Sequence, residues 1–272
     1  MTRPTDLFEE IAALRARGEP AALATVIGVR GSAPARDAMH MIVRADGTTS
    51  GTVGGGALED GIRRLGLEAI ASDESRRETF EISTEAADDT EMVCGGAVEV
   101  FVEPVTVPTC FLFGAGHLAI AAAPVAAIGG FRVVVADDRA THANAGRFPG
   151  AAEVLAKPFP DLLREIAPRL GSGSYCVVVT RSHRVDEDCV EACLRTGARY
   201  VGMIGSSNKV AKCRAELDRR GLAAADIARL RAPIGLDLDA RTHGEIAVAI
   251  VAEMVAVRRR AAIAGRGAGA GA

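Results

Sequence analysis

One stretch of the chain has the pattern of a strand, a glycine turn and a helix in direct succession. It runs from Thr109 to Ala119 and reads Thr-Cys-Phe-Leu-Phe-Gly-Ala-Gly-His-Leu-Ala. In such a unit Gly114 allows the tight turn, Gly116 leaves room for a phosphate, and amides at the helix start face the anion. Asp137 follows Gly116 by 21 residues, where a carboxylate can accept hydrogen bonds from ribose hydroxyls. The unit predicts a nucleotide or dinucleotide site, and the alternative is a tight turn that binds nothing.

The rest of the sequence predicts two domains of an α/β protein. After the glycine turn, apolar runs alternate with amphipathic helical patterns, which is typical of a parallel sheet with helices on both faces. We therefore predict a Rossmann-like nucleotide-binding domain over residues 109–260. Residues 1–105 have the pattern of a smaller α+β domain, with helices and hairpin-forming strands. Residues 261–272 are rich in alanine and glycine, which predicts a disordered tail.

Composition excludes several classes of function. The 272 residues carry a net charge of −3, which gives no attraction to nucleic acid. No run of about 18 apolar residues suggests a membrane span, and the acidic start does not fit a signal peptide. The six cysteines show neither a CxxC pair nor a disulfide framework, so most are expected to be buried thiols in a reducing compartment. We expect a cytoplasmic protein that binds neither nucleic acid nor membranes.

Two glycine-rich segments stand out in the first domain. Gly54-Gly55-Gly56 precedes a helix, and Cys94-Gly95-Gly96 follows an acidic loop. The glycines beside Cys94 expose its thiol, and a thiolate is a soft, reactive ligand. Glu59, one turn into the helix after the triplet, could accept hydrogen bonds from the amino groups of a ligand. The alternatives are a structural cysteine, a plain turn and a solvated carboxylate.

Candidate residues in the second domain follow the ends of predicted strands. His117 begins the helix after the glycine turn, where the helix dipole favours a neutral imidazole that can donate to a phosphate. His183 and Asp186 follow another strand, at the edge where open parallel sheets bind ligands. They could form a general base or a weak metal pair, although no third metal ligand stands at a recognisable spacing. Gly205 and Ser206 open a helix that carries Lys209, which repeats the pattern of an anion site. The alternatives are a simple helix start and solvated side chains.

Nine short pieces occur in order along almost the whole chain. They are Gly31–Pro34, Gly51–Glu59, Cys94–Gly96, Phe113–His117, Asp137–Arg139, Arg147–Pro149, Tyr200–Ser206, Pro233–Leu236 and Glu245–Ala247. Together they resemble the XdhC/CoxI family of xanthine dehydrogenase accessory factors, and Arg139 joins the candidate cofactor-binding residues with the fifth piece. Two positions depart from the pattern expected of relatives, because Ala57 replaces a cysteine and Arg181 replaces a histidine. These departures weaken any role that needs a thiol at 57 or paired imidazoles near His183.

The resemblance implies a protein that binds the molybdenum cofactor, as molybdopterin or its dinucleotide, and assists its maturation and insertion into a xanthine dehydrogenase-type molybdenum hydroxylase. Such a chaperone binds its ligand rather than turning it over. Cys94 would be the molybdenum or sulfur ligand, and Glu59 would accept hydrogen bonds from the amino groups of the pterin. A cysteine desulfurase is a further implied partner. The alternatives are an NAD(P)-dependent oxidoreductase and a nucleotide-sensing interaction module. The apolar final helix and the hairpin-rich first domain lead us to expect a homodimer.

Overall fold

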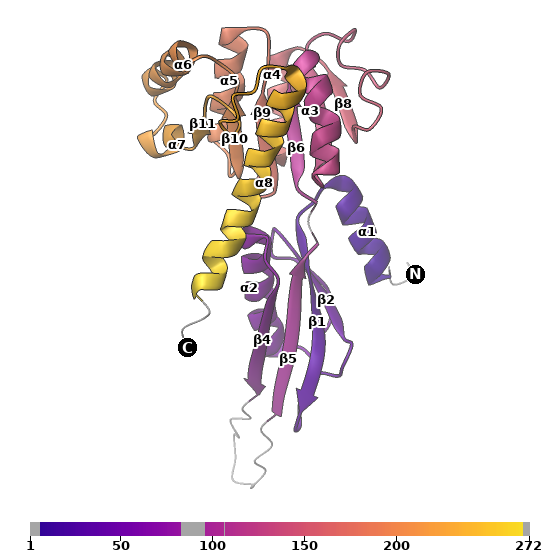
Figure 1. Cartoon of the computed structure of the whole chain (residues 1–272). Coiled ribbons are helices and arrows are strands. Elements are labelled where there is room, and N and C mark those ends of the chain that lie inside the picture. Colours follow the sequence, from indigo (N-terminus) through magenta and orange to yellow (C-terminus); the bar gives the residue numbers. More distant parts are fainter. Residues whose placement is uncertain (1–5, 83–95, 106, 269–272) are drawn as a thin grey trace. The chain divides into compact units, whose positions relative to one another are not determined.

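The computed structural model describes residues 6–82, 96–105 and 107–268 (Figure 1). The chain divides into two compact units, which we describe separately. The first unit is Met1–Thr106 with Ala261–Ala272, and the second unit is Val107–Arg260. The division falls between Thr106 and Val107, between the predicted domains of residues 1–105 and 109–260.

The first unit is built on an antiparallel sheet with the strand order β3-β2-β1-β5-β4. Its elements are α1 (Leu7–Arg17), β1 (Ala21–Arg30), β2 (His40–Arg44), β3 (Thr49–Gly51), α2 (Gly56–Ser72), β4 (Arg76–Ile82) and β5 (Gly96–Pro104). Alternate residues of β1 face opposite sides, because side chains of a strand alternate between the two faces of a sheet. Ala22, Ala24 and Val26 pack in the core that α2 covers, whereas Ala21 and Leu23 pack in the core that α1 covers.

The second unit contains a six-stranded parallel sheet with the order β11-β10-β9-β6-β7-β8. Its strands are β6 (Thr109–Phe113), β7 (Arg132–Asp137), β8 (Glu153–Ala156), β9 (Ser174–Val178), β10 (Tyr200–Met203) and β11 (Leu230–Arg231). Its helices are α3 (His117–Ile128), α4 (Phe159–Ile166), α5 (His183–Leu194), α6 (Ser207–Arg219) and α7 (Ala224–Ala228), with a 3-10 turn at Ala167–Arg169. The part of α8 (His243–Ala268) up to Arg260 belongs to this unit as well. The predicted α/β class and the Rossmann-like second domain are confirmed.

Helices cover both faces of this parallel sheet (Figure 1). One core contains buried residues of α4, α5, α6 and α7, and the other contains buried residues of α3 and α8. Neighbouring residues of β6 divide between them, since Phe111 and Phe113 lie in the first core and Cys110 and Leu112 in the second. The four central strands, β6, β7, β9 and β10, are buried on both faces, which explains why they read as continuous apolar runs.

The order of the strands fixes where a ligand can bind. The chain begins in the centre with β6, runs outward through β7 and β8, and then returns to build β9, β10 and β11 on the other side. The direction therefore reverses between β6 and β9, and ligands of open parallel sheets bind outside the carboxyl ends of the strands at such a switch point. The sequence segments that follow Phe113 and Val178 consequently lie side by side.

The last helix differs from the expected tail. α8 continues through Ala268, so residues 261–268 are helical where the sequence predicts disorder. Alanine has the highest helix propensity, so the repeated alanines after Arg260 extend a helix that tertiary packing has already started. Within the described residues, none of the helices combines the length and the apolar character that a membrane crossing needs.

Candidate functional site

The predicted glycine turn lies at the carboxyl end of β6 and is tightly packed on one side only. Gly114 has a φ of +112°, and a Cβ at this position would lie 2.5 Å from the carbonyl oxygen of Val179. Its amide donates to the carbonyl of Ala136 at 2.7 Å, which ties the turn to β7. At Gly116, by contrast, a Cβ would meet no atom within 4 Å. The turn is therefore held between β7 and β9, and its Gly116 side is open to a ligand.

Asp137 anchors this turn instead of facing an open site. Its side chain is only 2% exposed, and one carboxylate oxygen accepts from the amide of Ala115 at 2.8 Å. Arg139 donates to both oxygens, from Nε at 2.8 Å and from the terminal guanidinium nitrogen at 2.9 Å. Burial alone would raise the pKa of this carboxyl, but the hydrogen bonds from Arg139 and Ala115 outweigh it and hold the pKa well below its usual range. A ribose would have to displace Arg139 to use the carboxylate as predicted.

A second ion pair connects the ends of the two strands that flank β6. Arg181, after β9, donates to both carboxylate oxygens of Asp138, after β7, at 3.1 and 2.9 Å. Both side chains are partly exposed, at 54% and 29%. An exposed pair of this kind stabilises the fold by at most about 1 kcal/mol. The histidine expected at 181 is thus replaced by a cation that reaches across the sheet edge.

Lys209 contacts a buried carboxylate next to the predicted second anion turn. Its ammonium group pairs with Asp186 of α5, whose side chain is fully buried. The other oxygen of Asp186 accepts from the hydroxyl of Thr180 at 2.7 Å and from its amide at 3.2 Å. Gly205 makes this arrangement possible, because a Cβ there would lie 2.8 Å from the Lys209 stem. The hydroxyl of Ser206 accepts a hydrogen bond from the backbone amide of Lys209 and so caps the start of α6. The charge of Lys209 is therefore neutralised inside the protein.

The two candidate histidines have different surroundings. The exposed ring of His117, at the start of α3, stacks on His243 at the start of α8, with 5.8 Å between ring centroids. His183 begins α5, and its Nε2 lies 3.1 Å from a carboxylate oxygen of Glu187. Within the described residues, no group of three or more histidine, cysteine, aspartate or glutamate side chains could hold a metal ion.

Glycine-rich pieces of the first unit converge on the turn that follows β1. A Cβ at Gly54 would lie 3.0 Å from the carbonyl carbon of Pro34, and one at Gly96 would lie 2.4 Å from the carbonyl oxygen of Ser32. Gly55 and Gly56, in contrast, would meet no atom within 4 Å. Cys94 and Gly95 lie outside the described residues. The structure thus brings the triplet and the start of β5 to one loop, and the triplet leaves one side of its backbone open.

Glu59 holds the glycine triplet in place. Its Oε1 accepts from the hydroxyl of Thr52 at 2.6 Å, from the amide of Gly55 at 3.1 Å and from that of Val53 at 3.2 Å. The hydrogen bond from Thr52 is the main reason why the pKa of this carboxyl lies below its usual value. One carboxylate oxygen therefore shapes the turn. The contact with pterin amino groups stays a prediction.

The cysteines of the described part are all buried thiols, namely Cys110, Cys176, Cys189, Cys193 and Cys213. Burial raises the pKa of Cys110 to about 12 and that of Cys213 to about 11. At neutral pH such groups carry almost no thiolate, which is the reactive and metal-binding form. The predicted inert role of most cysteines is consistent with this environment.

Alkylation of the native protein should therefore modify one thiol of the six. We expect iodoacetamide at pH 8 to label Cys94 rapidly and to label the other cysteines only after unfolding, because the described thiols are buried and protonated. Peptide mass spectrometry locates the label. Rapid modification of Cys110 or Cys213 in folded protein would contradict this expectation, as would a Cys94 that stays unlabelled.

Sequence patterns missed one cation at the glycine turn. Arg147 follows β7 in the chain and donates to the carbonyl of Ala115 at 3.4 Å. Its Nε is buried without a hydrogen-bond partner, and no carboxylate pairs with it in the described part of the chain. The sequence pointed to Arg147 only as part of the piece Arg147–Pro149. It was not predicted to bind a ligand, because an isolated arginine in a loop is usually solvated. His243 and Asp138 were missed as well, because their contacts join residues far apart in sequence.

Comparisons with known proteins agree with this architecture. The profile of the XdhC Rossmann domain matches residues 110–254, and that of the XdhC and CoxI family matches residues 14–81. The chain is 32% identical to the uncharacterized protein YqeB of Escherichia coli strain K12 over 258 residues, which are 94% of the chain and 47% of YqeB. It is 30% identical to a Bacillus subtilis strain 168 protein described as a probable subunit of xanthine dehydrogenase, over 158 residues, 57% of the chain and 44% of that protein.

The chain thus spans about half the length of the curated relatives it matches. A crystal structure described as a xanthine dehydrogenase from Bacillus halodurans is 21% identical, with a TM-score of 0.49, and the match covers 93% of this chain and 95% of that one. The match to the Rossmann-domain profile extends over more than half of the chain and includes the glycine turn, Asp137 and the Lys209 helix. The protein therefore belongs to the XdhC family.

Proposed function

We propose that this protein is an accessory factor that binds the molybdenum cofactor and passes it to a xanthine dehydrogenase-type molybdenum hydroxylase. Membership of the XdhC family supports an accessory role, and one relative is itself described as a probable component of xanthine dehydrogenase. From the resemblance we also propose a cytoplasmic homodimer and a cysteine desulfurase partner that supplies sulfur.

The observation that carries the proposal is the unpaired arginine beside an open glycine turn. Arg147 has a buried Nε without a partner, and it contacts the turn whose Gly116 side is open. Arg139, Arg181 and Lys209 are each paired with an aspartate. Because a guanidinium binds a phosphate through two parallel hydrogen bonds, Arg147 is the cation best suited to a phosphate at this turn. The residues present thus fit the phosphate of a pterin cofactor or of a nucleotide.

The first unit carries a candidate segment of its own, suited to a soft metal or to sulfur. Its open backbone at Gly55 and Gly56 allows close approach, and Glu59 keeps that turn in one conformation. Cys94 would supply a thiolate, which is a soft ligand suited to molybdenum or to sulfur transfer. When bound, the cofactor supplies the metal centre that the recipient enzyme needs. The residues of this chain bind and orient it, and none of them is required to turn over a substrate.

An NAD(P)-dependent oxidoreductase remains the alternative function, because the strand order is that of a dinucleotide-binding fold. The carboxylate of Asp137 argues against it. That group occupies the position from which ribose is usually bound, but here it is buried and bonded to Ala115 and Arg139. The two functions differ in the ligand that the purified protein should prefer.

Titration with released molybdenum cofactor and, separately, with NADH tests the proposal. We expect tight binding of the cofactor and at least tenfold weaker binding to the Arg147→Met variant, because a charge-assisted hydrogen bond contributes about 1.5–3 kcal/mol. Arg164→Met is the matched control, since Arg164 lies exposed on α4 and contacts only its own helix. Tight NADH binding with hydride transfer and no cofactor binding would overturn the proposal.

A further inference from the structure

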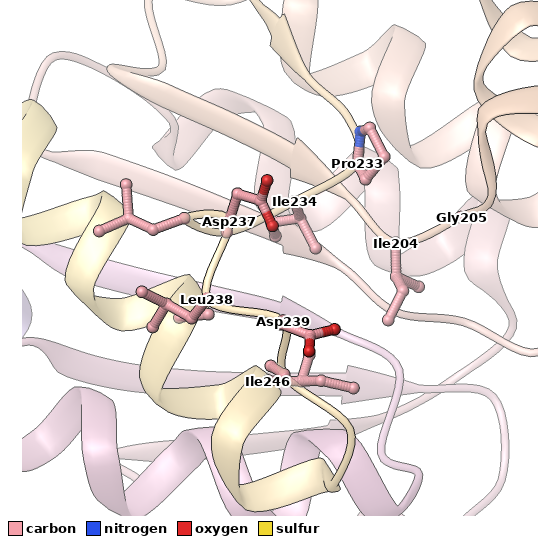
Figure 2. A pocket seen from close by; sticks show the side chains of 12 residues that line it. Ile204, Gly205, Pro233, Ile234, Asp237, Leu238, Asp239 and Ile246 are labelled. Carbon is pink, nitrogen blue, oxygen red and sulfur yellow. The ribbon is translucent and has the colours of Figure 1, made fainter.

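A cavity of about 520 Å³ opens in the second unit beyond the carboxyl end of β10 (Figure 2). Its apolar walls include Ile204 after β10, Ile234 after β11 and Ile246 of α8. Asp237 and Asp239 also line it, from the loop that joins Ile234 to α8. Among the candidate site residues that the sequence predicts, Gly205 lines this cavity, and the glycine turn at Gly114–Gly116 does not.

Contacts around the cavity fix its walls before any ligand binds. A Cβ at Gly202 would lie 2.5 Å from Ile234, so glycine at this point of β10 makes room for that wall residue. Glu253 of α8 accepts from the hydroxyl of Tyr200 at 2.6 Å and from the amide of Gly235 at 2.9 Å, which ties the loop to β10 and α8. One preformed cavity is thus built by three pieces of the family pattern. They are Tyr200–Ser206, Pro233–Leu236 and Glu245–Ala247.

The polar groups of the cavity select for hydrogen-bond donors. Among the described residues that line it, Asp237 and Asp239 carry the charge, and both are acidic. Within the described residues no hydrogen bond or ion pair engages Asp237, and Asp239 pairs only with Arg241 at 3.1 Å, with both side chains more than 80% exposed. Such a pair is easily exchanged for a ligand. Two carboxylates beside apolar walls repel an anion and attract a flat ring that carries N–H groups.

We propose that this cavity binds the edge, with adjacent ring N–H and exocyclic amino groups, that pterins and guanine share. Two parallel N–H donors match a carboxylate bidentately, as a guanidinium does. The apolar walls then cover the faces of the ring. Strands β9 to β11 form the second half of the dinucleotide-binding fold, and the cavity opens at the carboxyl ends of strands in this half. The assignment of a pterin as the ligand of this cavity rests on the proposed function, whereas the assignment of a guanine does not.

Binding of two small probes and their matched analogues tests this assignment. Neopterin and guanosine carry the edge, whereas inosine and the lumazine with the same side chain as neopterin lack its amino group. The chain contains no tryptophan, so pterin fluorescence can be followed without tryptophan background. We expect neopterin or guanosine to bind, and the analogues to bind about tenfold more weakly. Tighter binding of neopterin would identify the pterin source, and tighter binding of guanosine the guanine source. Equal affinity for the analogues, or no binding of either probe, would overturn the proposal.

Variants of the two aspartates locate the site. Asp237→Asn and Asp239→Asn should each weaken probe binding about tenfold, because each replaces a charged acceptor by a neutral one. Both side chains are exposed on a loop, so the variants should unfold at the wild-type temperature. Asp161→Asn on α4 is the control and should bind like the wild type. Unchanged probe binding in both cavity variants would refute the assignment.

The same experiment separates this inference from the proposed function. Retention of molybdenum cofactor without probe binding at the two aspartates would remove only the cavity assignment. Probe binding that depends on the aspartates, in a protein that never takes up molybdenum cofactor, would remove the proposed function and support a guanine nucleotide as the ligand.

Discussion

Replacing Lys209 with methionine is expected to lower the free energy of unfolding by about 3 kcal/mol. Lys209 pairs with Asp186, whose carboxylate is fully buried. Without the ammonium group, that charge keeps only its hydrogen bonds from Thr180. Removing one partner of a buried pair leaves an uncompensated charge, which is far more destabilising than losing an exposed pair. Urea denaturation at pH 7 measures the change.

Lys212→Met provides the matched control for this prediction, because Lys212 lies exposed on the same helix. It should change the free energy of unfolding by less than about 0.5 kcal/mol. Combining Lys209→Met with Asp186→Asn should recover part of the loss, since the second change removes the stranded charge. A Lys209→Met variant as stable as Lys212→Met would show that the buried pair does not stabilise the fold.

The Asp137→Asn variant is expected to lose about 2–3 kcal/mol of unfolding free energy at pH 7. The carboxamide keeps the size of the side chain but cannot accept hydrogen bonds with both of its ends. One of the groups that now donate to the carboxylate, on Ala115 or Arg139, would then face an amide NH₂. The glycine turn would lose its attachment to the end of β7. Asp161→Asn, on an exposed side chain, should change little.

The effect of Asp137→Asn should depend on pH in a defined direction. The folded pKa of Asp137 lies below the unfolded value of about 3.9. Its stabilisation is therefore present above the unfolded pKa and is lost as the pH falls toward the folded pKa. The gap in stability between wild type and variant should be full at pH 7 and smaller at pH 3. A gap that widens on acidification would contradict the assigned role.

Local sequence patterns were sufficient for the second unit. The run before Gly114 and the spacing to Asp137 depend on contacts within one strand–turn–helix unit, so they can be read without knowing the fold. The parallel sheet follows because each central strand is buried on both faces and is therefore apolar throughout. The same patterns predict that the candidate residues after β6, β7, β9 and β10 lie at one edge of the sheet, because the carboxyl ends of parallel strands share that edge.

The partners of charged side chains could not be predicted in this way. Asp137 was expected to face a ribose, but Arg139 takes up its oxygens. Lys209 was expected to face a phosphate, but Asp186 neutralises it from α5. Arg147 was overlooked, although its Nε is buried without a hydrogen-bond partner and no carboxylate among the described residues pairs with it. Such pairings depend on side-chain directions at a sheet edge, and residue type and spacing do not encode them.

The most direct test of the account is the small-molecule content of the protein after gentle purification. Metal analysis and mass spectrometry of wild type and Cys94→Ser, at equal folded concentration, would compare molybdenum, pterin and NAD(H). We expect molybdenum and pterin together in the wild type, both lost from Cys94→Ser, and no NAD(H). Bound NAD(H), or a Cys94→Ser variant that retains as much molybdenum as the wild type, would contradict it.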